Sequence, residues 1–213
     1  MNTILHELGH GVYSYYNDRS LPFILRDAAH TFTTEAIANF FGRLATDPLW
    51  MHDMGLIDEN ESIKIGENSR KSLRLQMIVF SRWAQVMYRF EKSMYENPDQ
   101  DLNKLWWDMV EKYQMLNRPE GRDMPDWASK IHIALYPCYY HNYLLGELLA
   151  SQIESYVTRN VSGGKSFTGK KELGAWMKEK IFMPGARYYW NEMIEKATGE
   201  KLTAKYYAEQ FVD

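Results

Sequence analysis

The sequence predicts an all-α protein, and three observations support that prediction. Apolar residues recur at intervals of three, four or seven along most of the chain, which is the period of an amphipathic helix. Alternation with a period of two, the pattern of a half-buried strand, extends over no useful length. Glycine and proline are sparse, at 13 and 7 of 213 residues, whereas aromatic residues reach 15%. Few helix breakers and many large side chains favour long helices packed through wide faces.

Two helices are predicted near the N-terminus. The first covers residues 3–16 and is followed by a link that contains Pro22. The second begins close to Thr31 or Thr33, because either hydroxyl can accept a hydrogen bond from the backbone N–H groups of a first helical turn.

A long helix and its successor are predicted in the middle of the chain. Over residues 71–96, one apolar stripe is formed by Leu73, Met77, Phe80, Ala84, Met87 and Met94. The pair Asn97-Pro98 ends that helix, and Asp101 is placed to cap the next one. The inward face of this next helix would consist of Leu102, Leu105, Trp106, Met109 and Tyr113.

The C-terminal third is predicted to contain one longer helix and three shorter ones. Pro137 stands where the longer helix would start, and residues 139–156 continue it with Gly146 as the sole breaker. Residues 161–165, which include a Gly-Gly pair, are expected to form an exposed loop. The shorter helices are expected over residues 171–180, over residues 187–196, and from about residue 203 onward.

Charge and hydropathy exclude two classes of partner. Lysine and arginine total 25 against 28 aspartates and glutamates, and a net charge of -3 provides no attraction for nucleic acid or an anionic membrane. The longest apolar runs, such as residues 77–80, are far too short to cross a bilayer, and residues 1–5 leave no room for a signal peptide. We therefore expect a soluble chain with one helical domain over residues 1–213 and an unassigned compartment.

The strongest chemical signal is the pentapeptide His6-Glu7-Leu8-Gly9-His10, which has the pattern H-E-x-x-H. On a helix, His6 and His10 lie one turn apart on one face and can offer imidazole nitrogens to a single metal ion. Glu7 lies about 100° further round the helix, where it can take a proton from a metal-activated water without binding the metal. The pattern therefore predicts a zinc site on the first helix.

A third zinc ligand must come from another part of the chain. Glu35 follows His10 by 25 positions, enough to finish the first helix, cross a loop and return a carboxylate from the second helix. Asp27 is a weaker alternative because it is expected to fall in the loop. Asn39, one turn beyond Glu35, is placed to accept a hydrogen bond from a ligand imidazole.

The sequence resembles a known peptidase family at several separate places. The matching segments are His6-Glu7-Leu8-Gly9-His10, Leu21-Pro22-x-x-Leu25-Arg26, Glu35-Ala36-Ile37, Lys130-Ile131-His132-Ile133, Tyr140-x-x-Tyr143 and Ile194-Glu195-Lys196-Ala197-Thr198-Gly199-Glu200-x-Leu202. They are similar to angiotensin-converting-enzyme-type peptidyl dipeptidases and, toward the C-terminus, to thimet oligopeptidase and bacterial oligoendopeptidases. The resemblance implies a helical gluzincin with oligopeptide substrates. It also implies that this chain is the C-terminal, zinc-bearing half, and that it pairs with an upstream half or with itself.

The resemblance also implies roles for a second group of residues. Tyr143 would stabilise the oxyanion of the tetrahedral intermediate, and His132 would hydrogen-bond the substrate backbone or that intermediate. Lys130 and Tyr140 would hold the C-terminal carboxylate of the substrate. One more residue separates His132 from the tyrosines here than in the converting enzymes, so Tyr139 is an alternative to Tyr140.

These observations predict a hydrolase, a zinc metallopeptidase that cleaves oligopeptides as an oligopeptidase or a peptidyl dipeptidase, with exo- or endo-cleavage left open. The alternative is an inactive helical fragment with a structural zinc site or a partner-binding role. The two hypotheses differ in coordination, since a catalytic zinc keeps one position open for water whereas a structural zinc is closed by four protein ligands.

Overall fold

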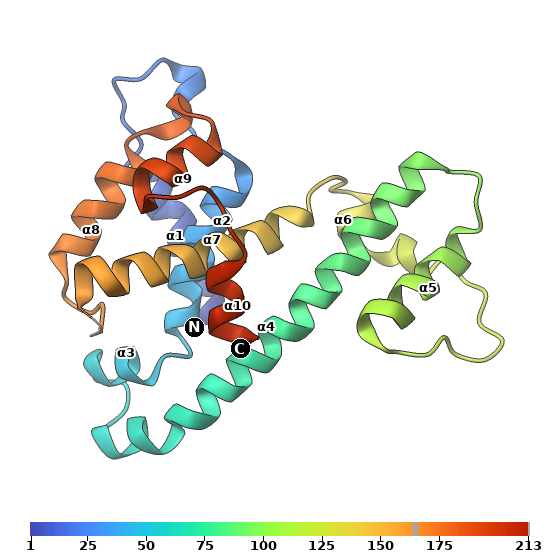
Figure 1. Cartoon of the computed structure of the whole chain (residues 1–213), viewed down its shortest axis with the longest axis horizontal. Helices are drawn as coiled ribbons and strands as arrows, with labels where there is room; N and C mark the ends of the chain where they lie inside the picture. Colours follow the sequence, from blue (N-terminus) through green and yellow to red (C-terminus); the bar gives the residue numbers. More distant parts are fainter. Residues whose placement is uncertain (164–165, 213) are drawn as a thin grey trace. The chain divides into compact units, whose positions relative to one another are not determined.

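A computed structural model describes residues 1–163 and 166–212, and within these residues every regular element is helical (Figure 1). The predicted all-α class is therefore confirmed. The α-helices are α1 (Asn2–Tyr15), α2 (Thr31–Leu44), α3 (Pro48–Asp53), α4 (Glu59–Glu96), α5 (Leu102–Gln114), α6 (Ile131–Ala134), α7 (His141–Val157), α8 (Lys171–Met177), α9 (Trp190–Thr198) and α10 (Lys205–Phe211). Short 3-10 turns cover Phe23–Leu25, Asp126–Ser129 and Gly185–Arg187, and π-helical turns cover Thr158–Ser162 and Lys178–Phe182.

The chain divides into two compact units. The first comprises Met1–Arg74 together with Leu145–Asp213, and the second comprises Leu75–Leu144. Helices α4 and α7 each have one end in one unit and the other end in the other. Each unit has a hydrophobic core of its own. The expectation of a single domain over residues 1–213 stays a prediction.

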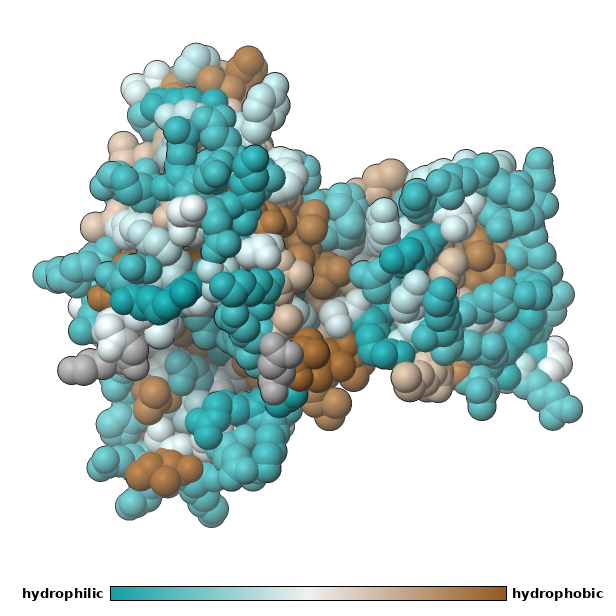
Figure 2. Space-filling model, viewed as in Figure 1, coloured by the Kyte–Doolittle hydropathy of each residue, from teal (hydrophilic) through white to brown (hydrophobic). Residues whose placement is uncertain are grey.

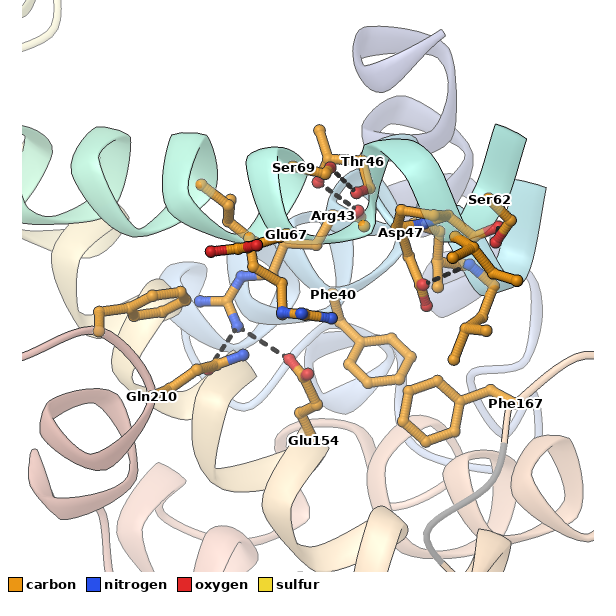
Figure 3. A pocket seen from close by; sticks show the side chains of 18 residues that line it. Phe40, Arg43, Thr46, Asp47, Ser62, Glu67, Ser69, Glu154, Phe167 and Gln210 are labelled. Carbon is orange, nitrogen blue, oxygen red and sulfur yellow. Dashed lines mark hydrogen bonds and ion pairs between the residues drawn. The ribbon is translucent and has the colours of Figure 1, made fainter. Parts of the chain in front are cut away.

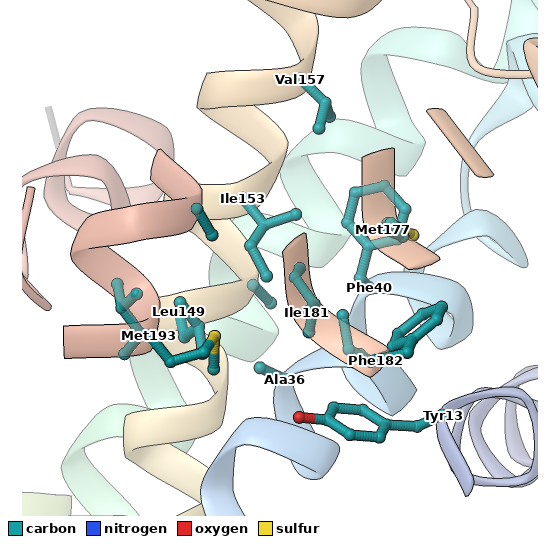
Figure 4. Close-up of a cluster of buried hydrophobic side chains, with 14 of the residues drawn as sticks. Tyr13, Ala36, Phe40, Leu149, Ile153, Val157, Met177, Ile181, Phe182 and Met193 are labelled. Atoms are coloured by element: carbon teal, nitrogen blue, oxygen red, sulfur yellow. The ribbon is translucent and has the colours of Figure 1, made fainter. Parts of the chain in front are cut away.

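The core of the first unit forms around α2 and α7 (Figure 4). Phe32, Ala36 and Phe40 follow one another at steps of four on α2 and present one apolar face. The remaining buried members of this core are Tyr13, Ile37, Leu149, Ala150, Ile153, Val157, Leu173, Met177, Ile181, Phe182, Met193, Ile194 and Ala197. Two charged side chains of α2 are also buried, that of Glu35 at 3% exposed and that of Arg43 at 9% exposed.

Helices α1 and α2 pack against each other in opposite directions. Asn2 Nδ2 donates a hydrogen bond of 2.8 Å to the carbonyl oxygen of Gly42, while eight residues later the His10 ring is 2.8 Å from the Thr34 hydroxyl. Between these pairs, a Cβ atom added to Gly9 would lie 2.7 Å from the α carbon of Ala38. Glycine therefore permits the close approach of the two helices at this point.

The second unit has a smaller core. Helix α5 packs into this core with the apolar face that the sequence predicted. Asp101 caps α5 by accepting a hydrogen bond of 2.9 Å from the backbone N–H of Lys104, as the sequence predicted. The buried residues of this core are Val86, Met87, Phe90, Trp106, Val110 and Ile133, and Leu102, Leu105, Met109, Tyr113 and Tyr140 pack against them.

Some predicted boundaries were wrong. Helix α4 begins at Glu59, twelve residues before the predicted start, because its first turns carry few apolar side chains and show no stripe. The N-cap of α2 is His30 rather than Thr31 or Thr33. The His30 ring accepts a hydrogen bond from the backbone N–H of Phe32, and the Thr33 hydroxyl donates one to the His30 carbonyl oxygen.

The predicted loop over residues 161–165 was also wrong in its first part. Residues 161 and 162 belong to a π-helical turn that continues directly from α7, and Ser162 is buried. Residues 164 and 165 lie outside the described part of the chain.

Hydrophilic residues cover most of the face shown in Figure 2, with apolar residues in smaller areas between them. Among the described helices, none combines the length and the apolar composition that a membrane-spanning segment needs.

Candidate active site

Three side chains from α1 and α2 converge on one point. Glu35 Oε2 lies 3.5 Å from His6 Nε2 and 3.8 Å from His10 Nε2. One ligand atom from each of the three residues lies within 4.8 Å of the other two. Asp27, the alternative third ligand, is exposed outside this group, and its Oδ1 accepts a hydrogen bond of 2.7 Å from the backbone N–H of Ala28.

The donor set fits a zinc ion in type and spacing. Zinc in proteins takes imidazole nitrogens and carboxylate oxygens at about 2.0–2.1 Å, which in a tetrahedron places the donors ~3.3 Å apart. The separations from Glu35 to His6 and His10 are only slightly larger. Among the residues that the structure describes, no fourth histidine, cysteine or acidic side chain joins the group.

The charge of Glu35 perturbs the two imidazoles unequally. A hydrogen bond to the Glu35 carboxylate raises the pKa of His6 above its ordinary value, although partial burial opposes that rise. Burial lowers the pKa of His10, and the charge of Glu35 only partly offsets it. Burying a carboxylate is costly unless it has a positive or hydrogen-bonding partner, and the His6 imidazole lies 3.5 Å from this one.

Thr34 orients one of the candidate ligands, and the sequence analysis did not identify it. Its hydroxyl lies 2.8 Å from Nδ1 of His10, whose Nε2 faces Glu35. A hydrogen bond at one ring nitrogen fixes which nitrogen is available to a metal. The sequence signal was the position of Thr34 directly before Glu35 on α2. Asn39 is half-buried on the same helix, and its role toward a ligand imidazole stays a prediction.

Glu7 is exposed on α1 and does not belong to the three-donor group. It follows His6 directly, so its carboxylate leaves the helix in a different direction from the two imidazoles. This is the arrangement that a general base needs, because the group must reach a water without occupying a ligand position.

A glycine of α7 allows that helix to pack closely against Glu35. A Cβ atom added to Gly146 would lie 2.9 Å from the Cβ of Glu35 and 3.2 Å from the backbone nitrogen of Ala36. Only a residue without a side chain allows α7 to approach α2 this closely. Gly9 and Gly146 thus allow the helices on both sides of Glu35 to approach it.

The second group of predicted residues forms a ring cluster within the second unit. The His132 Nε2 atom lies 3.1 Å from the Tyr143 hydroxyl oxygen, which is hydrogen-bonding distance. The centroid of the His132 ring is 5.8 Å from that of Tyr139, 5.1 Å from that of Tyr140 and 5.3 Å from that of Tyr143. The structure therefore brings together the imidazole and the three phenols named by the sequence analysis.

Lys130 and Tyr140 both lie against aromatic side chains of the second unit. The Lys130 ammonium is 5.6 Å from the ring centroid of Trp83 and 5.8 Å from that of Trp106. Burial raises the pKa of the Tyr140 phenol above its ordinary value, so this group stays protonated and can donate a hydrogen bond.

A cavity of about 680 Å³ lies elsewhere in the first unit (Figure 3). Its wall includes Arg43, which is 9% exposed, lies 3.2 Å from Oε2 of Glu154 and is 2.5 Å from Oε2 of Glu147. None of the three candidate metal ligands is among the described residues that line this cavity. The candidate site is therefore defined by converging donor atoms and not by this cavity.

Fold and site together define a class. An all-helical framework that carries H-E-x-x-H on one helix and a converging carboxylate on the next is characteristic of helical metal-dependent peptidases. Residues 1–211 match the model of the peptidase family described as angiotensin-converting enzyme. The chain belongs to this family.

Individual relatives are distant and longer than this chain. Carboxypeptidase 1 of Bacillus subtilis (strain 168) is 24% identical over 226 residues, covering 95% of this chain and 44% of that protein. Angiotensin-converting enzyme of Mus musculus is 24% identical over 220 residues, covering 98% of this chain and 16% of that protein. The inactive angiotensin-converting enzyme-related protein of Caenorhabditis elegans is 29% identical over 126 residues, covering 56% and 14%.

A solved structure shares the fold. The BsuCP crystal structure superposes with a TM-score of 0.70 at 19% sequence identity, covering 98% of this chain and 48% of that chain. The present chain thus spans less than half the length of these relatives.

Proposed function

We propose that this chain is the metal-bearing part of a zinc peptidase that hydrolyses peptide bonds in oligopeptides. The observation that supports this proposal is the convergence of His6, His10 and Glu35, with Glu7 next in sequence to the first ligand. Three protein donors leave a coordination position for water, which is typical of catalytic zinc, whereas structural zinc is closed by a fourth protein ligand.

Glu7 has the central chemical role in this proposal. Zinc bound by the three donors would supply Lewis acidity, which polarises the scissile carbonyl and makes water easier to deprotonate. Glu7 accepts the proton of the attacking water and then delivers it to the nitrogen of the leaving amine. Thr34 holds the His10 ring so that its Nε2 stays directed toward Glu35.

His132 and Tyr143 are proposed to serve the same reaction as hydrogen-bond donors to the oxyanion. Their mutual distance of 3.1 Å supports a shared task. Lys130 and Tyr140, with Tyr139 as the alternative, are proposed to bind the C-terminal carboxylate of the substrate.

The relatives support peptide substrates in general. One of them is named carboxypeptidase 1, and we propose that this chain likewise acts near the C-terminus of a peptide. Another is named inactive, so activity must be argued from the site residues and not from the family. The activity of the whole protein, and pairing with an upstream half or a second copy, also belong to this proposal, because the chain spans less than half of its relatives.

The test is peptide cleavage by the zinc-loaded chain, followed by mass spectrometry of the products. Peptides with free and with amidated C-termini are compared, and a chelator serves as the control. We expect cleavage that a chelator abolishes, that added zinc restores, and that favours the free carboxylate. Cleavage that persists in the chelator, or in the His6→Ala/His10→Ala double variant, would contradict the proposal.

A further inference from the structure

A buried carboxylate outside the predicted site holds the loop that precedes the tyrosines. Glu91 lies on the part of α4 that belongs to the second unit and is 6% exposed. Its Oε1 accepts a hydrogen bond of 2.5 Å from the backbone N–H of Cys138, 47 residues further along the chain. The same oxygen accepts a hydrogen bond of 3.1 Å from the Tyr95 hydroxyl. A carboxylate bonded to a backbone N–H forms one of the stronger hydrogen bonds found in proteins.

The loop is held at a residue with unusual backbone geometry. Cys138 has a φ of +56°, in the left-handed region that non-glycine residues seldom adopt. Such a conformation is unfavourable for an L-residue and persists only where surrounding contacts impose it. The hydrogen bond to Glu91 acts on this residue directly, so Glu91 is a contact that imposes the reversal of the chain.

The reversal at Cys138 sets the start of α7. The carbonyl oxygens of Tyr139 and Tyr140, the next two residues, accept the backbone N–H groups of Asn142 and Tyr143. These bonds form the first turn leading into α7, and they precede the side chain that lies 3.1 Å from His132. The direction in which the chain leaves residue 138 therefore determines where the phenols lie relative to the imidazole.

We propose that Glu91 is a positioning residue that keeps the Tyr143 hydroxyl within hydrogen-bond distance of His132. It acts through the backbone of Cys138 and does not itself contact the substrate. The effect of Glu91 on the ring cluster is argued from the geometry of the second unit alone. Its effect on catalysis rests on the proposed function. The two consequences are therefore measured separately.

The first measurement does not depend on activity. In the full chain, the ring signals of His132 are followed by NMR and assigned with a His132→Gln variant, since three nearby aromatic rings shift them strongly. We expect Glu91→Ala to move these signals toward those of a free histidine. Glu91→Gln keeps an acceptor oxygen and should restore them. Glu96→Ala, which removes an exposed glutamate from the same helix, should leave them unchanged.

Two further variants separate the backbone bond from other causes. Cys138→Gly keeps the N–H group and suits a positive φ, so it should preserve the His132 signals and exclude a role of the thiol. Glu91→Asp keeps the charge but withdraws the acceptor by one methylene, and it replaces Glu91→Ala if that variant does not fold. Unchanged His132 signals in a folded Glu91→Ala or Glu91→Asp variant would overturn the proposal.

The second measurement addresses catalysis. Glu91→Ala should lower kcat about tenfold or more, with little change in KM or zinc content, because the Tyr143 hydroxyl acts in the transition state. In a Tyr143→Phe background the same substitution should cost little, since its effect passes through that hydroxyl. Additive losses would overturn the catalytic consequence. A wild-type chain without any peptidase activity would instead contradict the proposed function, and the NMR result would still decide the role of Glu91.

Discussion

Glu35 shows how one residue can identify a site within an apolar helix. Helix α2 buries apolar side chains on both sides of it, yet position 35 carries a carboxylate that is almost fully shielded from water. A carboxylate in such a place is unfavourable unless a cation or several hydrogen bonds compensate its charge. The two imidazoles of α1 face it at 3.5 and 3.8 Å, and the three groups form the nitrogen and oxygen donor set that zinc prefers.

Replacing Glu7 tests the proposed proton transfer. The amide of Glu7→Gln cannot accept a proton but occupies the same exposed position on α1, so zinc content should be unchanged. Turnover should fall about 10²–10⁴-fold, the usual contribution of a general base. Metal analysis and steady-state kinetics measure the two effects. Glu61→Gln, which removes an exposed glutamate from the first turn of α4, is the control that should match the wild type.

Replacing Tyr143 tests the oxyanion role. Tyr143→Phe removes one hydroxyl while the ring remains, and loss of such a donor typically lowers kcat about 10²–10³-fold, or about 2.7–4 kcal/mol. KM should change little, because the bond would form mainly in the transition state. If Tyr139→Phe or Tyr140→Phe lost turnover while Tyr143→Phe behaved like the wild type, the oxyanion role would belong to that neighbour.

Among individual residues, the sequence predicted those whose spacing along a helix fixes their positions relative to one another. The i, i+4 histidines are an example, because any α-helix places them on one face. Thr34 and Glu91 were not predicted. Their partners, the His10 ring and the Cys138 N–H, lie 24 and 47 residues away and become neighbours only through tertiary packing. No local pattern records such a pairing.

At the scale of the helices, the candidate metal site depends most on the close packing of α1 on α2. Gly9→Ala would place a methyl group 2.7 Å from the α carbon of Ala38, so the helices must separate. We expect destabilisation of about 1–3 kcal/mol and weaker zinc retention. Gly11→Ala is the matched control, since a Cβ there meets no described atom within 4 Å. It should stabilise the chain by about 0.5–1 kcal/mol. Thermal unfolding and metal analysis compare the Gly9→Ala and Gly11→Ala variants. Equal stability and equal zinc retention in the two would contradict this account.

Helices α2 and α7 are joined by a buried ion pair. Arg43 and Glu147 are separated by 2.5 Å, with side chains 9% and 11% exposed. Arg43→Ala leaves the Glu147 charge buried without this partner, which typically destabilises a protein by about 3–5 kcal/mol. Arg122→Ala removes an exposed pair with Asp126 and should cost less than about 1 kcal/mol. Chemical denaturation measures both, and similar losses would show that the buried pair does not stabilise the unit.

Helix boundaries were predictable where a strong local signal exists. Asn97-Pro98 directly follows the last residue of α4, and Asp101 caps α5 as predicted. The start of α4 was missed because its first turns are polar and carry no apolar stripe, although Asp58 accepts a hydrogen bond of 2.8 Å from the backbone N–H of Glu61 there. The cap of α2 was assigned to a threonine because hydroxyls are favoured there, whereas the structure uses the ring of His30.

At the scale of the whole molecule, the sequence predicted the class but not the division into two compact units. No proline-rich or glycine-rich linker separates the units, because the chain passes between them inside the continuous helices α4 and α7. Helical periodicity is the same on both sides of such a crossing, so it shows no boundary. The family, in contrast, was predictable from short motifs, and the match over residues 1–211 confirms it.

The central claim is that His6, His10 and Glu35 bind one zinc ion and leave one position open. The direct test is metal analysis of the purified chain and of its Glu35→Gln and Asp27→Asn variants, with X-ray absorption spectroscopy of the coordination shell. We predict one zinc per wild-type chain, bound by two imidazoles, one carboxylate and water. Zinc should be retained in Asp27→Asn and largely lost in Glu35→Gln. Equal zinc content in the two variants, or a shell closed by four protein ligands, would contradict the claim.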